Sequence, residues 1–569
     1  MSVRQIPHSS AEGSGDPLGR VAFRLRIGVT GHRKLSHDLE RDLAECVQVQ
    51  FDRLVERLPA HKSTHIELTV ISQLAEGADR FVVHQVLSNA ATGGRQARLE
   101  AVLPLHRDAY ARIQGFDAAS REDFDALLEQ ATAVDEPSPT VDGDSGNAAA
   151  AYEAAGRKII ARCDVLLAIW DGHRTGGRGG TAETLLEAAS AGKPCVWIPA
   201  DPAEPVQDNL TRGTSDEFRD LVAGRAAVPP DRTRPPQELP RDVWKPLRDS
   251  LDPLQHFNSE PVPAQFDHRL RNEFGYPGGE DHWIAPYFLR ATMLAAKNQA
   301  RFNWYSRAIT LLAIAAAVML GVHLSLSSNP VWDWTEVASL AALTVVFLVL
   351  HQRGFHRRWV SYRFLAERLR SARFLIPAGV EFQWAEALVA VYIERNSSDW
   401  LMRAFHDLLP SERQLRRVRT RVADTDVLKR RLADDWIGKQ IAYHSQRSRH
   451  HMTWNRVLSV TIIALFVGTV VCAVLDASAI ARDTMGFLSV VFPVSGASLG
   501  ALLTVRQHRE LSERDEKMAT DLAAAQKTIR DADNRRALRD AGAQAARIMA
   551  EESDDWLGAL WFLDVEHPS

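Results

Sequence analysis

The sequence has little cysteine and almost no net charge. Its four cysteines include no Cys-x-x-Cys pair and no spacing typical of a metal site. This excludes a disulfide-rich secreted scaffold and favours a reducing, cytosolic setting for the soluble part. The formal net charge of −4 over 569 residues gives no whole-chain argument for nucleic-acid binding. Residues 1–20 lack an apolar core of signal-peptide length, so we expect them to be a flexible leader.

The most prominent feature of the sequence is a set of four long apolar runs. They cover about residues 308–326, 332–350, 457–475 and 484–505. A membrane-spanning helix needs roughly 20 mostly apolar residues. The second run reaches that length only if Trp332 and Trp334 lie in the membrane interface, and a buried core helix is the alternative for it. The sequence therefore predicts an all-α membrane region of four spans.

Basic residues flank the outer ends of these runs, whereas the two short connections within the pairs carry one basic residue, Arg482. Positively charged flanks stay cytoplasmic. We therefore predict two hairpins in the inner, cytoplasmic membrane, with both chain termini in the cytosol. No ionisable residue lies deep in the runs, although His323 lies near one end. A pore would be polar only through Ser, Thr and Gly, or would act by disrupting the bilayer.

The N-terminal part, residues 21–200, alternates strand-like apolar runs with helical patterns. This alternation predicts an α/β, Rossmann-like, doubly wound parallel sheet. The other predicted parts are a proline-rich linker with short ordered pieces over 201–281, a first hairpin with cytosolic helices over 282–380, cytosolic helices and a second hairpin over 381–505, and a C-terminal cytosolic helix over 506–569.

Two sequence patterns concern the helical half. Residues 299–314 and 448–463 are faintly similar, which suggests a duplicated two-helix unit. In the tail, Leu511, Met518 and Ala525 fall at one heptad phase, and Leu522 and Ile529 fall at another. A helix packed on the protein's own surface and a self-association helix both remain open, and we expect a homo-oligomer.

Three loops, each following a predicted strand, carry the candidate ligand-binding residues. In such folds the loops at the carboxyl ends of parallel strands bind ligands, so the three should form one site. The candidates are Gly31, His32 and Arg33 in the first loop, Ser72, Glu76, Gly77, Asp79 and Arg80 in the second, and Asp171, Gly179, Gly180, Thr181 and Glu183 in the third.

These residue types suit an anionic, sugar-bearing ligand. Glycines let the backbone approach a phosphate, a helix start presents free N–H groups, and Arg33 can add a bidentate contact. Ser72 can bond a phosphate or sugar, and Glu76 or Asp79 can take ribose hydroxyls. Two of these residues could instead have a structural role. Asp79 can cap a helix, and Glu183 can interact favourably with a helix dipole.

At these loops the unit resembles the SLOG superfamily, which joins the DNA-processing protein A fold and the cytokinin-activating LOG phosphoribohydrolases. "VTGHR" and "SQLAEGAD" are similar to the first two motifs of the DNA-processing branch, with Gln73 where that branch usually has Gly. "GGRGGTAE" is similar to the LOG phosphate loop. The resemblance implies a sensor that binds a nucleotide-derived ligand, with no metal or cofactor.

The LOG enzymes place a glutamate three positions after the Thr of that loop. Here Thr184 holds that position, and the acid is Glu183. The resemblance therefore implies binding without a catalytic residue. A membrane-tethered N-glycosidic nucleotide hydrolase that uses Glu183 and Arg33 is the enzymatic alternative, and a scaffold with a vestigial site is the third.

The rest of the chain resembles the SLATT-type membrane effectors of bacterial conflict and anti-phage systems. The resemblance rests on a basic-flanked hairpin followed by "RRWVSYRFLAERLRSARF", in which Trp359, Arg363, Glu367 and Arg370 lie at helical spacing. It implies a membrane effector that a second-messenger sensor triggers. The expected partners are a nucleotide-derived small molecule, membrane lipid and further copies of the chain, without nucleic acid.

Overall fold

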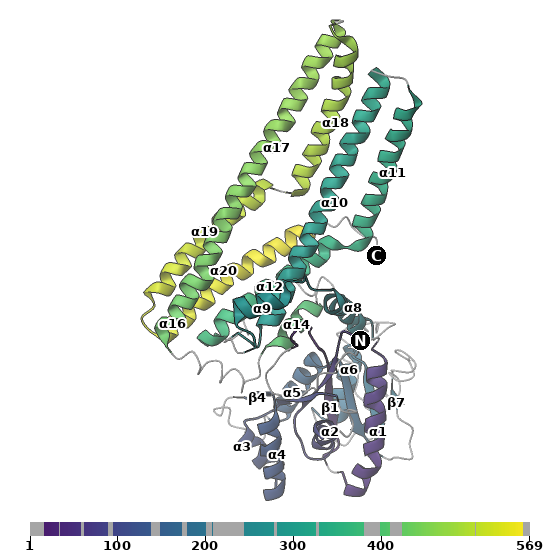
Figure 1. The fold of residues 1–569 in the computed structure, drawn as a ribbon. Coiled ribbons are helices and arrows are strands. Elements are labelled where there is room, and N and C mark those ends of the chain that lie inside the picture. Colours follow the sequence, from purple (N-terminus) through teal and green to yellow (C-terminus); the bar gives the residue numbers. More distant parts are fainter. Residues whose placement is uncertain are drawn as a thin grey trace, which may run out of the picture. The chain divides into compact units, whose positions relative to one another are not determined.

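The computed structural model describes residues 16–561 except 34, 59–61, 89–94, 138–147, 173–178, 201–206, 209–243, 278–280, 326–328, 381–398, 410–423, 479 and 507. Most of the expected leader, much of the expected linker and part of the glycine-rich loop lie outside these residues. The chain divides into two compact units. One comprises residues 20–260 and 397–414, and the other comprises residues 1–19, 261–396 and 415–569. Figure 1 labels their elements.

The N-terminal unit is built on a mixed sheet of seven strands in its described part, in the order β4-β3-β2-β1-β5-β6-β7. The first six strands are parallel and β7 is antiparallel. The strands are β1 (Phe23–Gly31), β2 (Ile66–Ser72), β3 (Ala97–Val102), β4 (Ala133–Asp135), β5 (Val165–Trp170), β6 (Cys195–Pro199) and β7 (Gln207–Asp208). The predicted parallel α/β architecture is confirmed.

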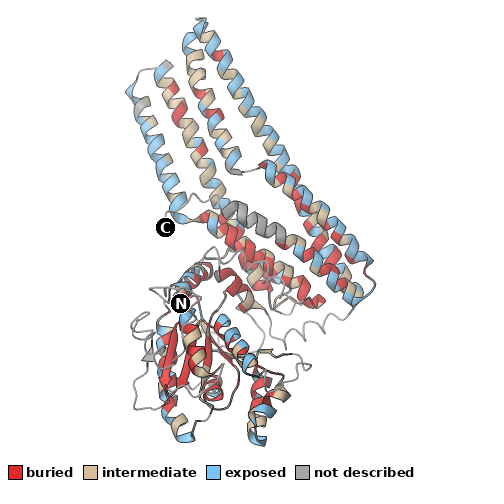
Figure 2. Ribbon diagram, turned by 180° about the vertical axis from the view of Figure 1, so that it is seen from behind, coloured by how far each residue is buried: buried red, intermediate tan, exposed pale blue. Residues whose placement is uncertain are grey.

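Helices connect these strands and cover the sheet. They are α1 (His37–Glu56), α2 (Ala78–Leu87), α3 (Arg107–Gln114), α4 (Ala118–Gln130), α5 (Ala148–Arg162) and α6 (Thr181–Ser190). Every residue of β5 is buried, as a strand covered on both faces requires. Figure 2 draws the visible strands of the sheet mostly as buried. The same helices explain two glycines of β1, since a Cβ at Gly28 would meet Ile159 of α5 and one at Gly31 would meet Ala78 of α2. Residues three apart in a strand point to opposite faces, so α5 and α2 cover different faces.

Two further helices complete this unit, α8 (Lys245–Ser259) and α14 (Asp399–Leu408). Asn258 of α8 bonds both backbone groups of Val21, just before β1. Trp400 of α14 contacts Phe257 of α8, with ring centroids 6.1 Å apart. Helix α14 comes from the chain between the two hairpins, yet it packs with the N-terminal unit. No sequence pattern indicated that this segment returns to the N-terminal unit.

The second unit is helical. Its elements are α9 (Phe266–Phe274), α10 (Ala285–Ser325), α11 (Pro330–Arg353), α12 (Phe355–Ala378), α16 (Thr425–Arg430), the π-helix η1 (Arg431–Gly438), α17 (Lys439–Ala477), α18 (Arg482–Arg506), α19 (His508–Asp531) and α20 (Arg535–Trp561). The tail is thus two helices, α19 and α20, where one long helix was expected. The buried face of α19 carries Met518, Leu522, Ala525 and Ile529 in one core with Trp436 of η1, so it packs within its own chain.

Four helices of this unit are long and apolar enough to cross a membrane. No more than 18% of the apolar window of any of them is buried inside the described structure, and Figure 2 draws the hairpins mostly as a mixture of exposed and intermediate residues. An apolar surface of this extent is stable in lipid, which favours the membrane assignment over four core helices. Glycines allow close helix packing. Gly321 of α10 faces Phe487 of α18, between the two hairpins, and Gly468 of α17 faces Phe492 of α18, within the second hairpin.

The helical unit repeats its own plan. A 41-residue α10, a 24-residue α11 and a 24-residue α12 are followed later by a 39-residue α17, a 25-residue α18 and a 24-residue α19. In each half the third helix folds back along the first (Figure 1). The matching lengths and packing agree with the faint sequence similarity and support a duplicated hairpin-plus-helix unit.

We predict opposite effects for two glycine substitutions. Gly31→Ala should destabilise the N-terminal unit by about 1–3 kcal/mol, because the new Cβ would lie 2.4 Å from the Cβ of Ala78 and 2.6 Å from the carbonyl oxygen of Ile169. Gly156→Ala should be neutral or stabilising by up to about 1 kcal/mol, because it lies within α5 and its nearest new neighbour is 3.4 Å away. Thermal unfolding of the full-length protein in detergent measures both, and equal stabilities would contradict the assigned packing.

Candidate functional site

The three predicted loops lie at the same edge of the sheet. The first follows β1, the second follows β2 and the third follows β5. These strands are parallel neighbours, with β1 between β2 and β5. From β1 the sheet continues on one side through β2, β3 and β4, and from β5 it continues on the other side through β6 and β7. The boundary between β1 and β5 is therefore the topological switch point, where such sheets bind ligands.

His32 and Asp171 join the two tips across this switch point. The backbone N–H of Asp171 donates to Nε2 of His32 at 2.9 Å, and Oδ1 of Asp171 lies 3.1 Å from the same nitrogen. The backbone N–H of His32 also donates to the carbonyl of Ile169 at 3.0 Å. These contacts fix the first and third loops against each other.

Arg33 lies beside this pair and is exposed. Its guanidinium carbon lies 5.5 Å from the centroid of the Tyr152 ring, a cation–π contact. The side-chain amide of Gln114 donates a hydrogen bond to the Tyr152 hydroxyl. Tyr152 and Gln114 were missed by sequence reasoning, because α5 and α3 carry no motif that points to the switch point.

The second loop is closed on itself around Leu74. Leu74 is buried and has a backbone φ of 58°, a left-handed conformation that is uncommon for a non-glycine residue. Its N–H donates to Oγ of Ser72 at 2.9 Å, and Nε of Arg80 donates to its carbonyl at 3.0 Å. The Ser72 hydroxyl in turn donates to Asp79 at 3.0 Å. Ser72, Asp79 and Arg80 are buried and hold this turn, so a ligand at the switch point does not contact their side chains in this arrangement.

Glu76 and Arg80 point away from the switch point and toward α4. Together with Gly77 they line a cavity of 420 Å³ between α1, α2 and α4. Nη1 of Arg80 donates to the carbonyl and hydroxyl of Ser120 at 2.8 and 2.9 Å. The Ser120 hydroxyl donates to Glu76. Gly77 has a φ of 83° and packs on the backbone of His32 and Arg33, so its role in this arrangement is to allow the first two loops to touch.

The third loop ends at the start of α6. Oε2 of Glu183 accepts the backbone N–H of Gly179 at 2.6 Å, so this carboxylate closes its own loop. Gly180 is the N-cap residue in extended backbone, and Thr181 begins the helix. The N–H groups of a first helical turn have no acceptor within the helix, so this turn can bind an anion. Gly176 and its neighbours in the predicted glycine-rich loop lie outside the described residues.

The switch point therefore brings together His32, Arg33, Asp171, Gly180 and Thr181. The cation of Arg33, the ring of Tyr152 and the N-terminus of α6 are all suited to a phosphate-bearing ligand with a planar group. The carboxyl groups of Asp79 and Glu183 are engaged elsewhere. A group of three or more His, Cys, Asp or Glu residues that could hold a metal ion is not found among the residues that the structure describes.

Asp79 yields a pH prediction. Burial raises its pKa from 3.8 to about 7, and the hydrogen bonds from Ser72 and the loop backbone offset only part of that rise. The folded state thus binds a proton that the unfolded state releases above pH 4, so this group lowers stability as the pH rises from about 4 to about 7. The loss is up to about 4 kcal/mol for the full shift.

Asp79→Asn keeps a neutral side chain at every pH, so its stability should fall less than that of the wild type between pH 5 and 8. The pH dependence of thermal unfolding of the full-length protein in detergent measures this difference. Glu187→Gln, at a half-exposed site on α6, is the control. Parallel pH profiles for the wild type and Asp79→Asn would contradict the assignment of a buried, protonated Asp79.

Part of the chain matches a known protein family. Residues 433–556, from η1 to α20, match the family model SLATT_1, described as "SMODS and SLOG-associating 2TM effector domain 1". None of the curated proteins compared with the chain is similar to it. The parallel α/β sheet of the N-terminal unit is consistent with the SLOG resemblance, although it does not by itself identify that superfamily. Residues 433–556 therefore form a SLATT-type two-helix effector domain, of a kind associated with SMODS and SLOG conflict systems.

Proposed function

We propose that the chain is a membrane effector whose N-terminal unit senses a nucleotide-derived anion. The observation that carries this proposal is the meeting of the β1 and β5 tips at the switch point, in a chain whose residues 433–556 match a SLOG-associating effector domain. In this proposal Arg33 and the first turn of α6 bind phosphate, and Tyr152 stacks on the base or sugar. Binding then biases the hairpins toward a state that perturbs the bilayer.

Helix α14 is the proposed coupling element. Nη1 of Arg403 donates to Oδ1 of Asp164 at 2.7 Å, and the same guanidinium bonds the carbonyl of Arg24. Nη2 of Arg26 donates to Asp407 at 2.6 Å. Burial alone would raise the pKa of Asp164, but Arg403 and Arg26 outweigh it and lower that pKa. The helix is thus held at the amino ends of β1 and β5, and a shift in these strands would move it.

The hydrolase alternative would need a general base, and His32 beside Asp171 is the candidate. Nε2 of His32 already accepts the backbone N–H of Asp171, so its lone pair does not take a proton in this arrangement. Also against this alternative, Glu183 is engaged by the N–H of Gly179, and Thr184 donates its hydroxyl to the carbonyl of Gly180 at 3.1 Å. Thr184 occupies the place where the LOG enzymes have their glutamate. We therefore propose binding without hydrolysis.

We predict that Gly180→Val abolishes nucleotide binding without unfolding the protein. Gly180 has φ −75° and ψ 168°, an extended backbone that valine also adopts, but the branched side chain would cover the first-turn N–H groups. Isothermal titration calorimetry with AMP, ADP and ATP on the full-length protein in detergent should show binding for the wild type. The affinity of the variant should fall at least tenfold.

Ser190→Val is the matched control, because it places the same branched side chain at the exposed last residue of α6, at the opposite end of that helix from Gly180. Unchanged affinity in Gly180→Val would contradict the assigned loop. Chromatographic detection of free base in the same samples would favour the hydrolase, and we expect none.

A second prediction concerns coupling. Arg403→Ala leaves Asp164 buried with fewer cationic partners, which should destabilise the docking of α14 by about 3–5 kcal/mol. In cells where the wild type depolarises the membrane, as read with a voltage-sensitive dye, this variant should respond more weakly while its purified form still binds nucleotide. Arg41→Ala, which removes an exposed pair with Asp38, is the control. Deletion of residues 308–505 should abolish the response, and depolarisation by the deleted form would contradict the proposal.

A further inference from the structure

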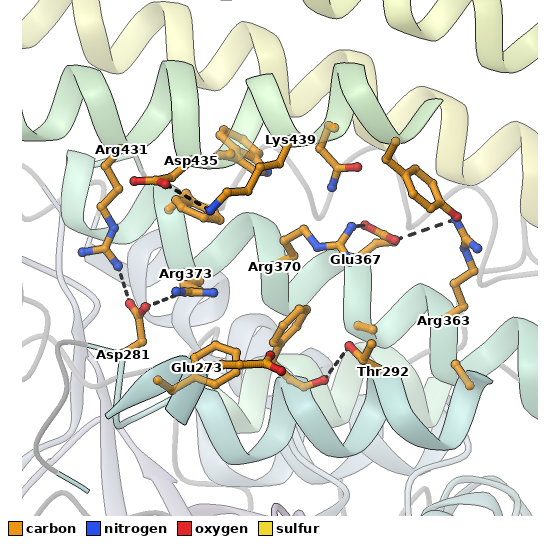
Figure 3. Close-up of a pocket in the computed structure, with 18 of the residues that line it drawn as sticks. Glu273, Asp281, Thr292, Arg363, Glu367, Arg370, Arg373, Arg431, Asp435 and Lys439 are labelled. Atoms are coloured by element: carbon orange, nitrogen blue, oxygen red, sulfur yellow. Dashed lines mark hydrogen bonds and ion pairs between the residues drawn. The ribbon is translucent and has the colours of Figure 1, made fainter. Parts of the chain in front are cut away.

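The helical unit contains a cavity of 1010 Å³ that the sequence did not indicate (Figure 3). Its walls come from both halves of the repeat: α9, α10 and α12 from the first half, and α16, η1 and α17 from the second. All of its lining residues belong to one compact unit. The volume is at the upper end of the range for small-molecule sites.

The lining of this cavity is basic. Six of its side chains carry a positive charge and four carry a negative one, a surplus of two. The cations are Arg363, Arg370, Arg373, Arg430, Arg431 and Lys439. Five arginines in one cavity supply the planar, forked donors that bind phosphate groups bidentately.

The ion pairs inside the cavity leave this surplus in place. Arg373 and Arg431 converge on one carboxylate, Asp281, as Figure 3 shows. In the same way Glu367 is shared by Arg370 at 2.6 Å and Arg363 at 3.9 Å. Because one carboxylate neutralises one guanidinium, each group of three keeps a net positive charge.

One further side chain adds to the capacity for a ligand. Arg430 lines the cavity, is exposed, and has no ion-pair partner within the described part of the chain. Its guanidinium is therefore available to an anion.

Aromatic rings lie beside the arginines. The guanidinium of Arg370 is 5.5 Å from the ring centroid of Phe288, and that of Arg373 is 4.7 Å from the ring of Phe274. Rings in these positions can also stack on a planar ligand group. The cavity therefore combines paired arginines with flat apolar walls, which suits a phosphorylated anion better than an inorganic ion alone.

We propose that this cavity binds a multiply charged, phosphate-bearing ligand that bridges the two halves of the helical unit. The site is separate from the switch point and does not depend on it. The phosphate could belong to a soluble metabolite or to the headgroup of an anionic phospholipid. Gln299 of the lining lies about 14 Å along α10 from the apolar run, and Tyr443 lies about 21 Å along α17 from its run, at 1.5 Å per residue. This separation favours the soluble source.

The ligand would act by bringing the halves together. Arg363, Arg370 and Arg373 come from α12, whereas Arg430, Arg431 and Lys439 come from the segment that leads into α17. An anion between them would replace the repulsion between two basic surfaces with attraction. Binding would therefore stabilise the helical unit as a whole and favour one arrangement of its two hairpins.

The test is the double variant Arg370→Gln with Arg431→Gln. Each substitution leaves its carboxylate with another arginine, Arg363 for Glu367 and Arg373 for Asp281, so the fold should persist. The control Arg509→Gln removes the same kind of charge from an exposed pair on α19. The soluble arm titrates pyrophosphate and ATP into the full-length protein in neutral detergent by calorimetry, in the Gly180→Val background to silence the switch point.

The lipid arm compares thermal unfolding in nanodiscs of phosphatidylcholine with and without phosphatidylglycerol. We expect the double variant to bind pyrophosphate or ATP at least tenfold more weakly, or to lose the stabilisation by phosphatidylglycerol, while Arg509→Gln keeps both. A response in one arm alone identifies the source and supports the site. Equal responses of the double variant and the control, or no response in either arm, would overturn the proposal.

Discussion

The arrangement of the N-terminal unit depends on a buried ion pair between Arg403 and Asp164. Asp164 directly precedes β5, and Arg403 belongs to α14, some 240 residues later in the chain. A buried carboxylate is stable only when it is paired and hydrogen-bonded, so this contact ties α14 to the central strands. The chain leaves the helical unit after the first hairpin, docks on the sheet and returns for the second. Both hairpins are therefore covalently attached to one small helix that the sheet holds.

The sequence was sufficient to predict the sheet, because alternating apolar and helical patterns report directly on buried strands and the helices between them. It also predicted that the three loops share one edge, since parallel strands place their carboxyl ends together. The sequence did not show which polar side chains of these loops point toward the site and which point into the protein. Ser72 and Asp79 follow the strand as a ligand-binding pair would, yet the left-handed turn at Leu74 directs them inward.

In the helical unit, too, the elements could be predicted from the sequence but the contacts between them could not. Length and apolar composition predicted the four candidate spans, which the structure forms as long helices, and the basic flanks predicted their grouping into two pairs. The cavity between α12 and α17 could not be seen in the sequence, because its arginines come from segments about 60 residues apart and read separately as ordinary basic helices. The tail was also ambiguous. Its heptad pattern fits any partner helix, and only the three-dimensional packing shows that η1 supplies the partner for Leu522 and Ile529.

The duplicated plan of the helical unit has a consequence for assembly. The matched family is defined by two transmembrane helices, and here residues 433–556 account for one hairpin while α10 and α11 form another. Each chain therefore carries two hairpins of the same plan and of different sequence. Any homo-oligomer of this chain would contain twice as many hairpins as chains and would bring two non-identical hairpin sequences into one assembly.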